Sequence, residues 1–502
     1  MNHNQLSQIL PPVIRLIIVF SLLLFAGCAH RGNEQSLNEY VAPSADQLWT
    51  PPKADISALL PAEKTVDIPE NLLRPGSQWQ ITDVIEVALR NNPQTRAAWY
   101  TARSAAADLL SEKGTYYPQL DINTDAAVRE NLAPDEVEGE SVRSFEPALE
   151  LSWLLFDFGG RSASVKEKRQ ALLAADFSHN AAIQDAVLLV LQTYFQYVKA
   201  KALVKSAEAS LQEATQSLAA AEKQHEQGLA TIADVLQAKT ALSQAQLNLD
   251  DAAGQVQVLR GALATAMGMP ANTPYDIEDL TWNPPLDRVT DQVDDCIRRA
   301  QASRPDLAAR KSAVEQAMAR VGRFRSELFP TVSLRNRLEG RVDSDTDQWE
   351  SGNTTELLVN VPLFYGYSRR YDLVRARQEA LAQQEQFNTL EQRVIFQVWS
   401  SYFNLKTAAK RVHTSEDLLS SARQSYDVAL GRYQEGVGGF LDLLAAQSTL
   451  ENARAQRVEA VADWYVSLAN LARDTGALWS RNPDERGVLD MLPSATMKEN
   501  KP

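Results

Sequence analysis

The feature that most constrains this chain is a long internal repeat. The segment Gly228-Leu-Ala-Thr-Ile-Ala-Asp-Val-Leu returns 208 residues later as Gly436-Val-Gly-Gly-Phe-Leu-Asp-Leu-Leu. The same offset pairs Phe156 with Phe364, Arg161 with Arg369 and Gly268 with Gly476, and an offset of 212 pairs Pro93 with Pro305 and Pro118 with Pro330. A period this long does not fit a solenoid, so the chain is interpreted as a duplicated half-molecule.

Each copy of the repeated segment interrupts two long helical patterns. Glycine is favoured where a helix ends with a positive φ. Thr231 then supplies an N-cap hydroxyl for the next helix, with Asp234 in the capping-box position. Gly439 replaces Thr231 in the second copy, so its cap is expected to be weaker. The pattern predicts two helical hairpins with tips near residues 228 and 436.

Four segments change to a period of two, with apolar residues alternating with charged ones. They predict two strand hairpins, residues 118–156 and 330–364, each with one apolar and one charged face. A transmembrane barrel explains this pattern, and a soluble sandwich with one solvated face is the alternative. Four strands cannot close a barrel, and lipid does not tolerate an open sheet edge. A barrel therefore requires a cyclic oligomer.

The remaining patterns predict helices of two lengths. The longer ones, residues 161–227 and 369–435, would be about 100 Å long, and 232–267 about 55 Å. The 232–267 helix is expected to continue end to end into 291–328, and 441–474 into 82–116, which is broken at Asn92-Pro93. Such helices suit the wall of a tube. Glycines at 159, 160 and 366 are expected to bend the chain between strand and helix. Aromatic residues at the strand ends indicate either a membrane-interface belt or junction packing.

The N-terminus is predicted to carry a targeting signal. Residues 1–27 are predicted to be a signal peptide, since the apolar run is too short to span a bilayer. Leu24-Phe25-Ala26-Gly27-Cys28 is similar to a lipoprotein cleavage box, which would lipidate Cys28. An ordinary signal peptide with an incidental cysteine is the alternative. Residues 28–74 are then an extended lipidated linker, 75–285 the first repeat, 286–480 the second, and 481–502 a flexible tail.

Several function classes are excluded by composition and motifs. A net charge of −14 argues against a nucleic-acid partner. The five histidines have no metal-ligand spacing, and neither a Gly-x-Ser-x-Gly motif nor a phosphate loop is present. We therefore expect no enzyme activity, no catalytic residue, no cofactor and no metal site.

Over residues 75–480 the chain resembles the TolC-type outer-membrane efflux factor family, in its lipoprotein branch. The marks are the duplication, Pro118 and Pro330 before strands, the two tips, and Leu155-Phe156-Asp157 followed by Gly159-Gly160-Arg161. The resemblance implies a homotrimer with a 12-stranded outer-membrane β-barrel, four strands per chain, continuous with a periplasmic α-helical barrel. It implies an exit duct for a tripartite efflux or type I secretion system. The partners would be a periplasmic adaptor protein, an inner-membrane transporter and outer-membrane lipid.

The resemblance also assigns residues. Asp442 matches an acidic ring at the periplasmic gate, and Tyr433 and Asp234 match tip residues that hold it closed, as hydrogen-bond donor and acceptor. Helix N-terminal electrostatics is the alternative for both aspartates. The adaptor would dock on the tips, which comprise Gly228, Leu229, Ala230, Thr231, Gly436, Val437, Gly438 and Gly439. The alternative function is a non-conducting lipid-anchored coiled-coil scaffold, which would not need strands with a charged face.

Overall fold

The structure is a computed structural model that describes residues 66–69, 72, 78–131, 140–278, 284–286, 292–343 and 348–478. Cys28, the predicted signal peptide 1–27, most of the predicted linker 28–74 and the predicted tail 481–502 lie outside these residues. The chain from Asp67 onwards forms one compact unit, and the architecture described here is that of this unit.

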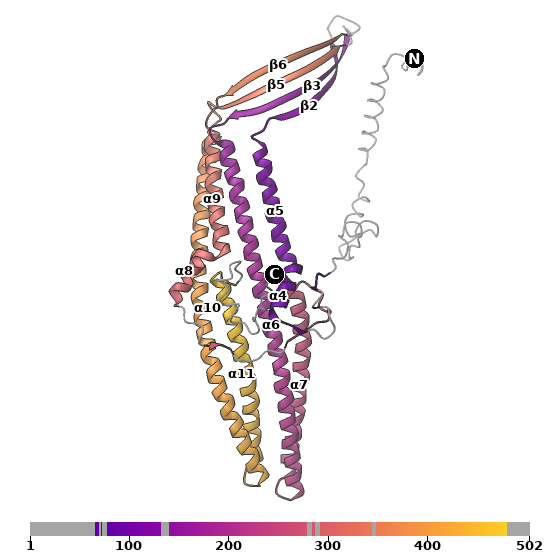
Figure 1. Cartoon of the computed structure of the whole chain (residues 1–502), viewed down its shortest axis with the longest axis vertical. Coiled ribbons are helices and arrows are strands. Elements are labelled where there is room, and N and C mark those ends of the chain that lie inside the picture. Colours follow the sequence, from indigo (N-terminus) through magenta and orange to yellow (C-terminus); the bar gives the residue numbers. More distant parts are fainter. Residues whose placement is uncertain are drawn as a thin grey trace, which may run out of the picture. The chain divides into compact units, whose positions relative to one another are not determined.

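Two long helical hairpins dominate the unit (Figure 1). Helices α6 (Gly160–Glu226) and α10 (Ser368–Gln434) have 67 residues each, which corresponds to about 100 Å. Each turns back into a 35-residue helix, α7 (Ile232–Ala266) or α11 (Phe440–Asp474). Four shorter helices complete the set: α4 (Ile81–Asn91), α5 (Pro93–Gly114), α8 (Val293–Ser303) and α9 (Pro305–Ser326).

The helices lie side by side in a layer that is four helices wide. Near the sheet, α6 packs between α5 and α9, and α9 packs against α10; towards the tips, α6 packs between α7 and α11, and α11 packs against α10. Helix α10 is therefore an edge of this four-helix layer, and the short helix α8 also packs against it. The opposite edge is α5 near the sheet and α7 near the tips.

The end-to-end stacking of the short helices differs from the prediction. Just after α7, an added Cβ at Gly268 would lie 2.7 Å from the carbonyl oxygen of Asn91, the last residue of α4, at the joint where α5 begins. Just after α11, an added Cβ at Gly476 would lie 3.2 Å from the amide nitrogen of Arg304, the residue before α9. The prediction stacked 232–267 on 291–328 and 441–474 on 82–116, and it was wrong in both cases. Each short helix stacks on a helix of its own repeat.

Proline sets the joints between the short helices. The predicted break at Asn92-Pro93 is observed, and Asn92 caps α5 by accepting hydrogen bonds from the amides of Gln94 and Thr95. The segment predicted as one helix, 291–328, is in fact broken between α8 and α9 at Pro305. Proline is disfavoured inside a helix and accepted at its first position. Because Pro305 is the repeat equivalent of Pro93, the repeat already indicated a helix break at Pro305.

A four-stranded antiparallel sheet stands at one end of the helices. Its strands are β2 (Gln119–Asn131), β3 (Glu140–Phe156), β5 (Thr331–Asp343) and β6 (Trp349–Asn360), in the order β2-β3-β5-β6. Leu120 pairs with Leu151 in the first hairpin, and their repeat equivalents Val332 and Val359 pair in the second. Within the described chain, β2 and β6 are open edges. A two-stranded parallel pair, β1 (Gln78–Trp79) with β4 (Asp276–Ile277), lies apart from this sheet.

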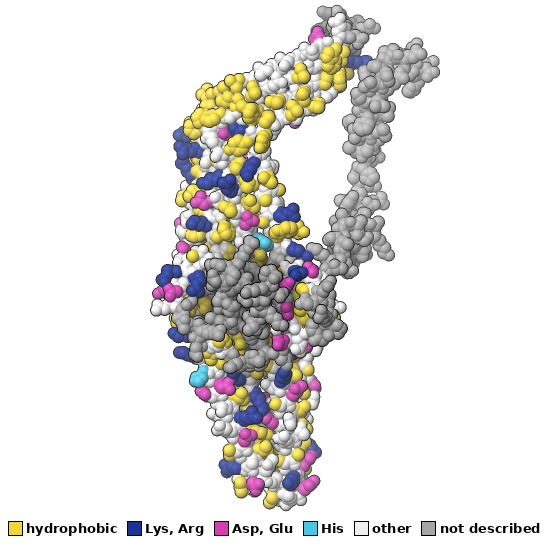
Figure 2. Space-filling model, viewed as in Figure 1, with side chains coloured by type: hydrophobic (Ala, Val, Ile, Leu, Met, Phe, Trp, Pro, Cys, Tyr) yellow, Lys and Arg dark blue, Asp and Glu magenta, His cyan; other side chains and the backbone are white. Residues whose placement is uncertain are grey.

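The two faces of the sheet differ in polarity, as predicted. Leu120, Ile122 and Leu357 lie on one face and are 64–78 % exposed, and Figure 2 shows hydrophobic side chains gathered over the sheet. On the other face, Arg335 pairs with Glu150 at 3.1 Å, and Arg341 with Glu146 at 3.6 Å. Among the described residues, no helix combines the length and apolar character needed to cross a membrane.

The bend between strand and helix uses two successive left-handed residues in each repeat. These are Phe158 (φ 51°) and Gly159 (φ 89°) before α6, then Gly366 (φ 58°) and Tyr367 (φ 62°) before α10. Gly160 was predicted to contribute to the bend, but it already belongs to α6. It is needed for space, because an added Cβ would lie 2.7 Å from the Ser326 hydroxyl.

Candidate functional site

The first hairpin tip joins α6 to α7 through residues 227–231. Gly228 adopts φ 75°, and the amides of Leu229 and Ala230 both bond to the Gln224 carbonyl, which closes the end of α6. The Asp234 carboxylate accepts hydrogen bonds from the Thr231 amide at 2.8 Å and its hydroxyl at 3.0 Å. The predicted capping box is therefore confirmed. It commits the Asp234 carboxylate to its own helix.

The second tip has the same turn with a weaker helix start. Gly436 adopts φ 72°, and the Val437 amide bonds to the Arg432 carbonyl. Gly439 stands at the N-cap of α11 and offers no side chain to cap it. Asp442, the repeat equivalent of Asp234, is exposed in the first turn of α11. Without a threonine to bind, its carboxylate remains available at the surface.

Among the described residues, no hydrogen bond joins Tyr433 to Asp234, although the prediction made them donor and acceptor. The Tyr433 hydroxyl is buried and has no hydrogen-bond partner among the described residues. Burial raises the pKa of Tyr433, and the nearby negative charge of Asp234 raises it further. The two residues are therefore neighbours without being bonded, because the Asp234 carboxylate is taken up by Thr231. The role of both residues in a gate stays a prediction.

Tyr433 belongs to an apolar cluster that joins the two hairpins, here called the tip core. Its ring lies 5.3 Å from that of Phe440. Ala221 of α6 and Val235 of α7 pack in the same cluster, so all four tip-forming helices contribute. The further members are Ala238, Ala422, Tyr426, Leu443, Ala446, Leu450 and Ala453. The two tips are therefore held as one apolar unit.

The polar connection between the tips comes from Gln224, which no sequence pattern singles out. Its side-chain nitrogen donates to the carbonyl oxygens of Tyr433 at 3.3 Å and Gln434 at 2.8 Å. It thereby links the end of α6 to the end of α10. A glutamine in a polar helix has no distinguishing sequence signal. Only its position one turn before Gly228 points to the tip.

Further polar pairs join α6 to α11, from the tips towards the middle of the layer. Arg454 donates two hydrogen bonds to Glu213, at 2.5 and 2.7 Å, with both side chains largely buried. Lys199 bonds to Glu459 at 2.9 Å. This bond and the lysine charge lower the pKa of Glu459. These pairs hold the two hairpins in one register.

The Leu155-Phe156-Asp157 and Arg161 motif ties strand, turn and helix together. The Asp157 carboxylate accepts a hydrogen bond from the Arg161 amide at 2.6 Å. The Arg161 side chain bonds to the carbonyls of Leu155, at the end of β3, and Thr115, after α5. Its repeat equivalent, Arg369, bonds to the carbonyl of Glu327 and stacks over Tyr365 at 3.8 Å. Aromatic pairs such as Phe158 with Phe329 pack in these junctions.

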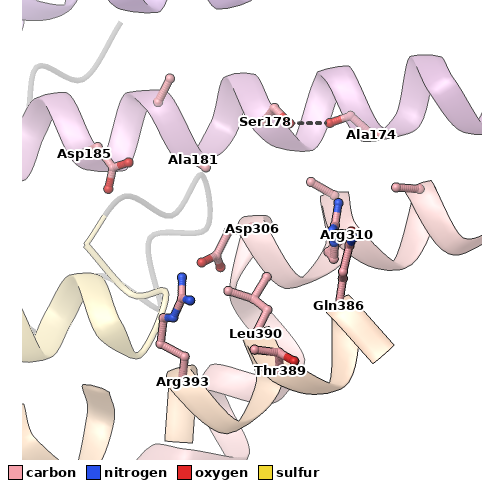
Figure 3. Close-up of a pocket in the computed structure, with 13 residues that line it drawn as sticks. Ala174, Ser178, Ala181, Asp185, Asp306, Arg310, Gln386, Thr389, Leu390 and Arg393 are labelled. Atoms are coloured by element: carbon pink, nitrogen blue, oxygen red, sulfur yellow. Dashed lines mark hydrogen bonds between the residues drawn. The ribbon is translucent and has the colours of Figure 1, made fainter. Parts of the chain in front are cut away.

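A cleft of about 700 Å³ lies between α6, α9 and α10, where α11 ends and α9 begins (Figure 3). Asp185, Asp306, Arg310 and Arg393 line it, together with alanines of α6 and α9. Because the cleft lining carries charged groups of both signs, their number favours neither an anionic nor a cationic ligand. Within the described residues, no group of three or more His, Cys, Asp or Glu is arranged to hold a metal ion.

Beside this cleft, a buried arginine joins α9 to α11. The Arg304 guanidinium bonds to both carboxylate oxygens of Asp306, at 2.9 and 2.6 Å, and lies 3.7 Å from Asp474. Burial alone would raise the pKa of Asp306, but the hydrogen bond and charge of Arg304 outweigh it and lower the pKa. The repeat equivalent of Arg304 is the capping residue Asn92, so this charged joint exists in one repeat only.

Comparisons with known proteins agree with this architecture. Protein CyaE of Bordetella pertussis is 28 % identical over 385 residues, which cover 75 % of this chain and 80 % of that protein. The solvent efflux pump outer membrane protein SrpC of Pseudomonas putida is 24 % identical over 92 % of this chain and 98 % of its own length. A crystal structure of CusC has a TM-score of 0.70 at 21 % identity, covering 80 % of this chain and 95 % of that one. That likeness concerns the fold alone.

The match to a family model gives the class of protein, a channel-type outer-membrane protein rather than an enzyme. Residues 84–269 and 296–477 match the outer membrane efflux protein family, and the chain belongs to that family. The predictions of the family, of an outer-membrane efflux role and of a non-enzymatic protein are thereby confirmed. The two matched ranges correspond to the two repeats.

Proposed function

We propose that this protein is the outer-membrane exit duct of a tripartite efflux or secretion system, acting as a passive trimeric conduit from the periplasm to the exterior. The observation that carries this proposal is the four-stranded sheet, with an exposed apolar face, an ion-paired opposite face and two open edges. Three copies, joined β6 to β2, would give twelve strands with lipid outside and a polar lumen. The long helices would continue this barrel into the periplasm.

The partners follow from the two ends of the unit. The tips lie farthest from the sheet and are the proposed docking site for a periplasmic adaptor, through which an inner-membrane transporter would deliver substrate. Residues 228–231 and 436–439 include the small residues that permit close helix approach. Relatives are described as solvent efflux and pyoverdine export outer membrane proteins, which supports an export role. A non-conducting scaffold is disfavoured, because it has no use for a charged strand face.

The proposed test is single-channel recording from the purified full-length protein in planar lipid bilayers. We expect stepwise conductance, and native mass spectrometry in detergent should give the mass of three chains. A stable monomer without conductance would overturn the proposal. The same bilayer without the detergent-extracted protein serves as the control.

We also propose that Cys28 carries lipid as the mature N-terminus. Mass spectrometry of the mature chain should find acyl chains on Cys28 that are missing in Cys28→Ser. A mature start at another residue would contradict this. Loss of lipid should leave the conductance unchanged, because the sheet provides its own apolar surface.

A further inference from the structure

The cleft between α6, α9 and α10 has the size of a site for a small molecule. Its volume of about 700 Å³ falls within the range of pockets that hold small organic ligands. Side chains of three helices line it, and Figure 3 shows them around one shared space. The cleft lies away from both the tips and the sheet, so the proposed duct function does not use it.

Small side chains on α6 open this space. Three positions of α6 that line the cleft have larger residues at the equivalent positions of α10, which line it too. The pairs, 208 residues apart, are Ser178 with Gln386, Ala181 with Thr389, and Ala182 with Leu390. Ala309 and Ala313 of α9 add further small side chains to the lining. The lining is therefore largely apolar on the α6 and α9 sides.

Both carboxylates of the lining are already bound to arginines that do not line the cleft. Arg304 bonds to both carboxylate oxygens of Asp306, and Asp185 accepts two hydrogen bonds from Arg473, at 3.0 and 2.9 Å. The same two arginines lie 3.7 and 3.1 Å from the buried Asp474. This network therefore contains one more carboxylate than guanidinium groups.

The two arginines of the lining have no carboxylate partner among the described residues. Arg310 of α9 donates to the side-chain oxygen of Gln386, which is neutral. Arg393 of α10 is exposed, and no described residue forms a hydrogen bond or ion pair with it. In Figure 3 its side chain extends from α10 into the space between the helices. The two guanidinium groups bring free N–H donors to the cleft and reverse the negative excess of the network.

The other polar groups of the lining that could act as donors are engaged within their own helices. The hydroxyls of Ser178 and Thr389 donate to the carbonyl oxygens of Ala174 and Glu385, one turn earlier. The free polar groups are therefore mainly arginine donors, and they stand beside apolar side chains. A guanidinium group binds a carboxylate through two parallel hydrogen bonds, a geometry that few other groups match.

We propose that this cleft binds a small organic anion, a carboxylate attached to an apolar body. Its carboxylate contacts Arg310 and Arg393, and its body covers Leu390 and the alanines of α6 and α9. A cation is disfavoured, because it would meet free donors and carboxylates that are already paired. Inorganic phosphate would leave the apolar side of the cleft uncovered. The proposal goes beyond the duct function and does not depend on conductance.

Isothermal titration calorimetry of the purified full-length protein in a nonionic detergent tests the site. The probe is 2-naphthoate, and 2-naphthamide has the same ring system without the charge. Titration into detergent alone corrects for partition into micelles. We expect 2-naphthoate to bind, and 2-naphthamide to bind about tenfold more weakly or less, because it lacks the charge-assisted hydrogen bonds. Equal binding of the two compounds, or no binding of 2-naphthoate, would overturn the proposal.

Three variants then locate the bound anion. Arg393→Gln should weaken binding of 2-naphthoate by about tenfold, because a charge-assisted hydrogen bond is lost. Ala182→Leu places on α6 the side chain that α10 carries at the equivalent position, and it should abolish binding by filling the cleft without a change of charge. Arg377→Gln is the matched control, an exposed arginine of α10 that lies 16 residues earlier, or about 24 Å along the helix.

The control variant should bind 2-naphthoate as the parent protein does. Unchanged binding in Arg393→Gln, or an equal loss in Arg377→Gln, would show that the anion binds elsewhere and would overturn the proposal. If Ala182→Leu lowers the thermal unfolding temperature too far to be tested, Arg393→Gln still decides the question, since its side chain is exposed.

Discussion

At the scale of single residues, two equivalent aspartates have different environments. Asp234 is bound by Thr231, while Asp442 is exposed beside Gly439. In the proposed trimer, three copies of Asp442 would surround the periplasmic opening, where clustered negative charge attracts cations. We expect Asp442→Asn to reduce cation selectivity in bilayer recordings and to weaken block by multivalent cations. Asp234→Asn is the matched control and should change selectivity less. Unaltered selectivity in Asp442→Asn would exclude this residue from the pore.

Gln224 and Tyr433 should respond differently to the loss of their polar atoms. Gln224→Ala removes two hydrogen bonds between the tips, each worth about 0.5–1.5 kcal/mol, and should raise resting conductance. Tyr433→Phe removes a hydroxyl that is buried without a partner among the described residues. It should leave conductance unchanged and thermal stability equal or higher. A higher conductance in Tyr433→Phe would indicate that the hydroxyl finds a partner in the trimer.

At the scale of elements, the hairpin turn depends on backbone conformation more than on space. An added Cβ at Gly436 would meet only Leu229, at 3.9 Å, but φ is 72°. Asparagine tolerates this conformation, whereas a β-branched residue does not. We expect Gly436→Val to impair export in a resistance assay while the trimer persists, and Gly436→Asn to retain most of the activity. Equal activity of the two variants would show that the turn geometry is unimportant for docking.

The joint between α9 and α11 should make stability dependent on pH. The pKa of Asp306 is lowered by Arg304, so its contribution is present above the unfolded pKa of about 4 and is lost as pH falls through the lower folded value. Asp306→Asn should cost about 1.5–3 kcal/mol near neutral pH. The difference in thermal unfolding temperature between the two proteins should shrink below pH 4. A difference independent of pH would exclude this pair as its cause.

At the scale of the whole molecule, local patterns predicted the elements better than their arrangement. The helix ends at Glu226 and Gln434 and the capping box at Thr231 depend on residues adjacent in sequence, so one chain sufficed to predict them. The stacking of α7 on α5 brings together Gly268 and Asn91, which are far apart in sequence, and no local pattern encodes such a contact. Gln224 contacts two residues that lie 209 and 210 positions further along the chain. It stands in an ordinary helical pattern, so no local feature indicates this contact.

The unequal caps of the two tips also have a dynamic consequence. Helix α7 begins with a complete capping box, while α11 begins at a glycine that satisfies none of its first amides. Replacing a capping side chain by glycine costs a few tenths of a kcal/mol. The bond from the Thr231 amide to the Asp234 carboxylate, which the second tip does not have, adds to this difference. Local unfolding should therefore start at the second tip. Amide hydrogens of residues 440–442 should exchange with deuterium faster than those of 232–234, so that each chain would open one hairpin before the other.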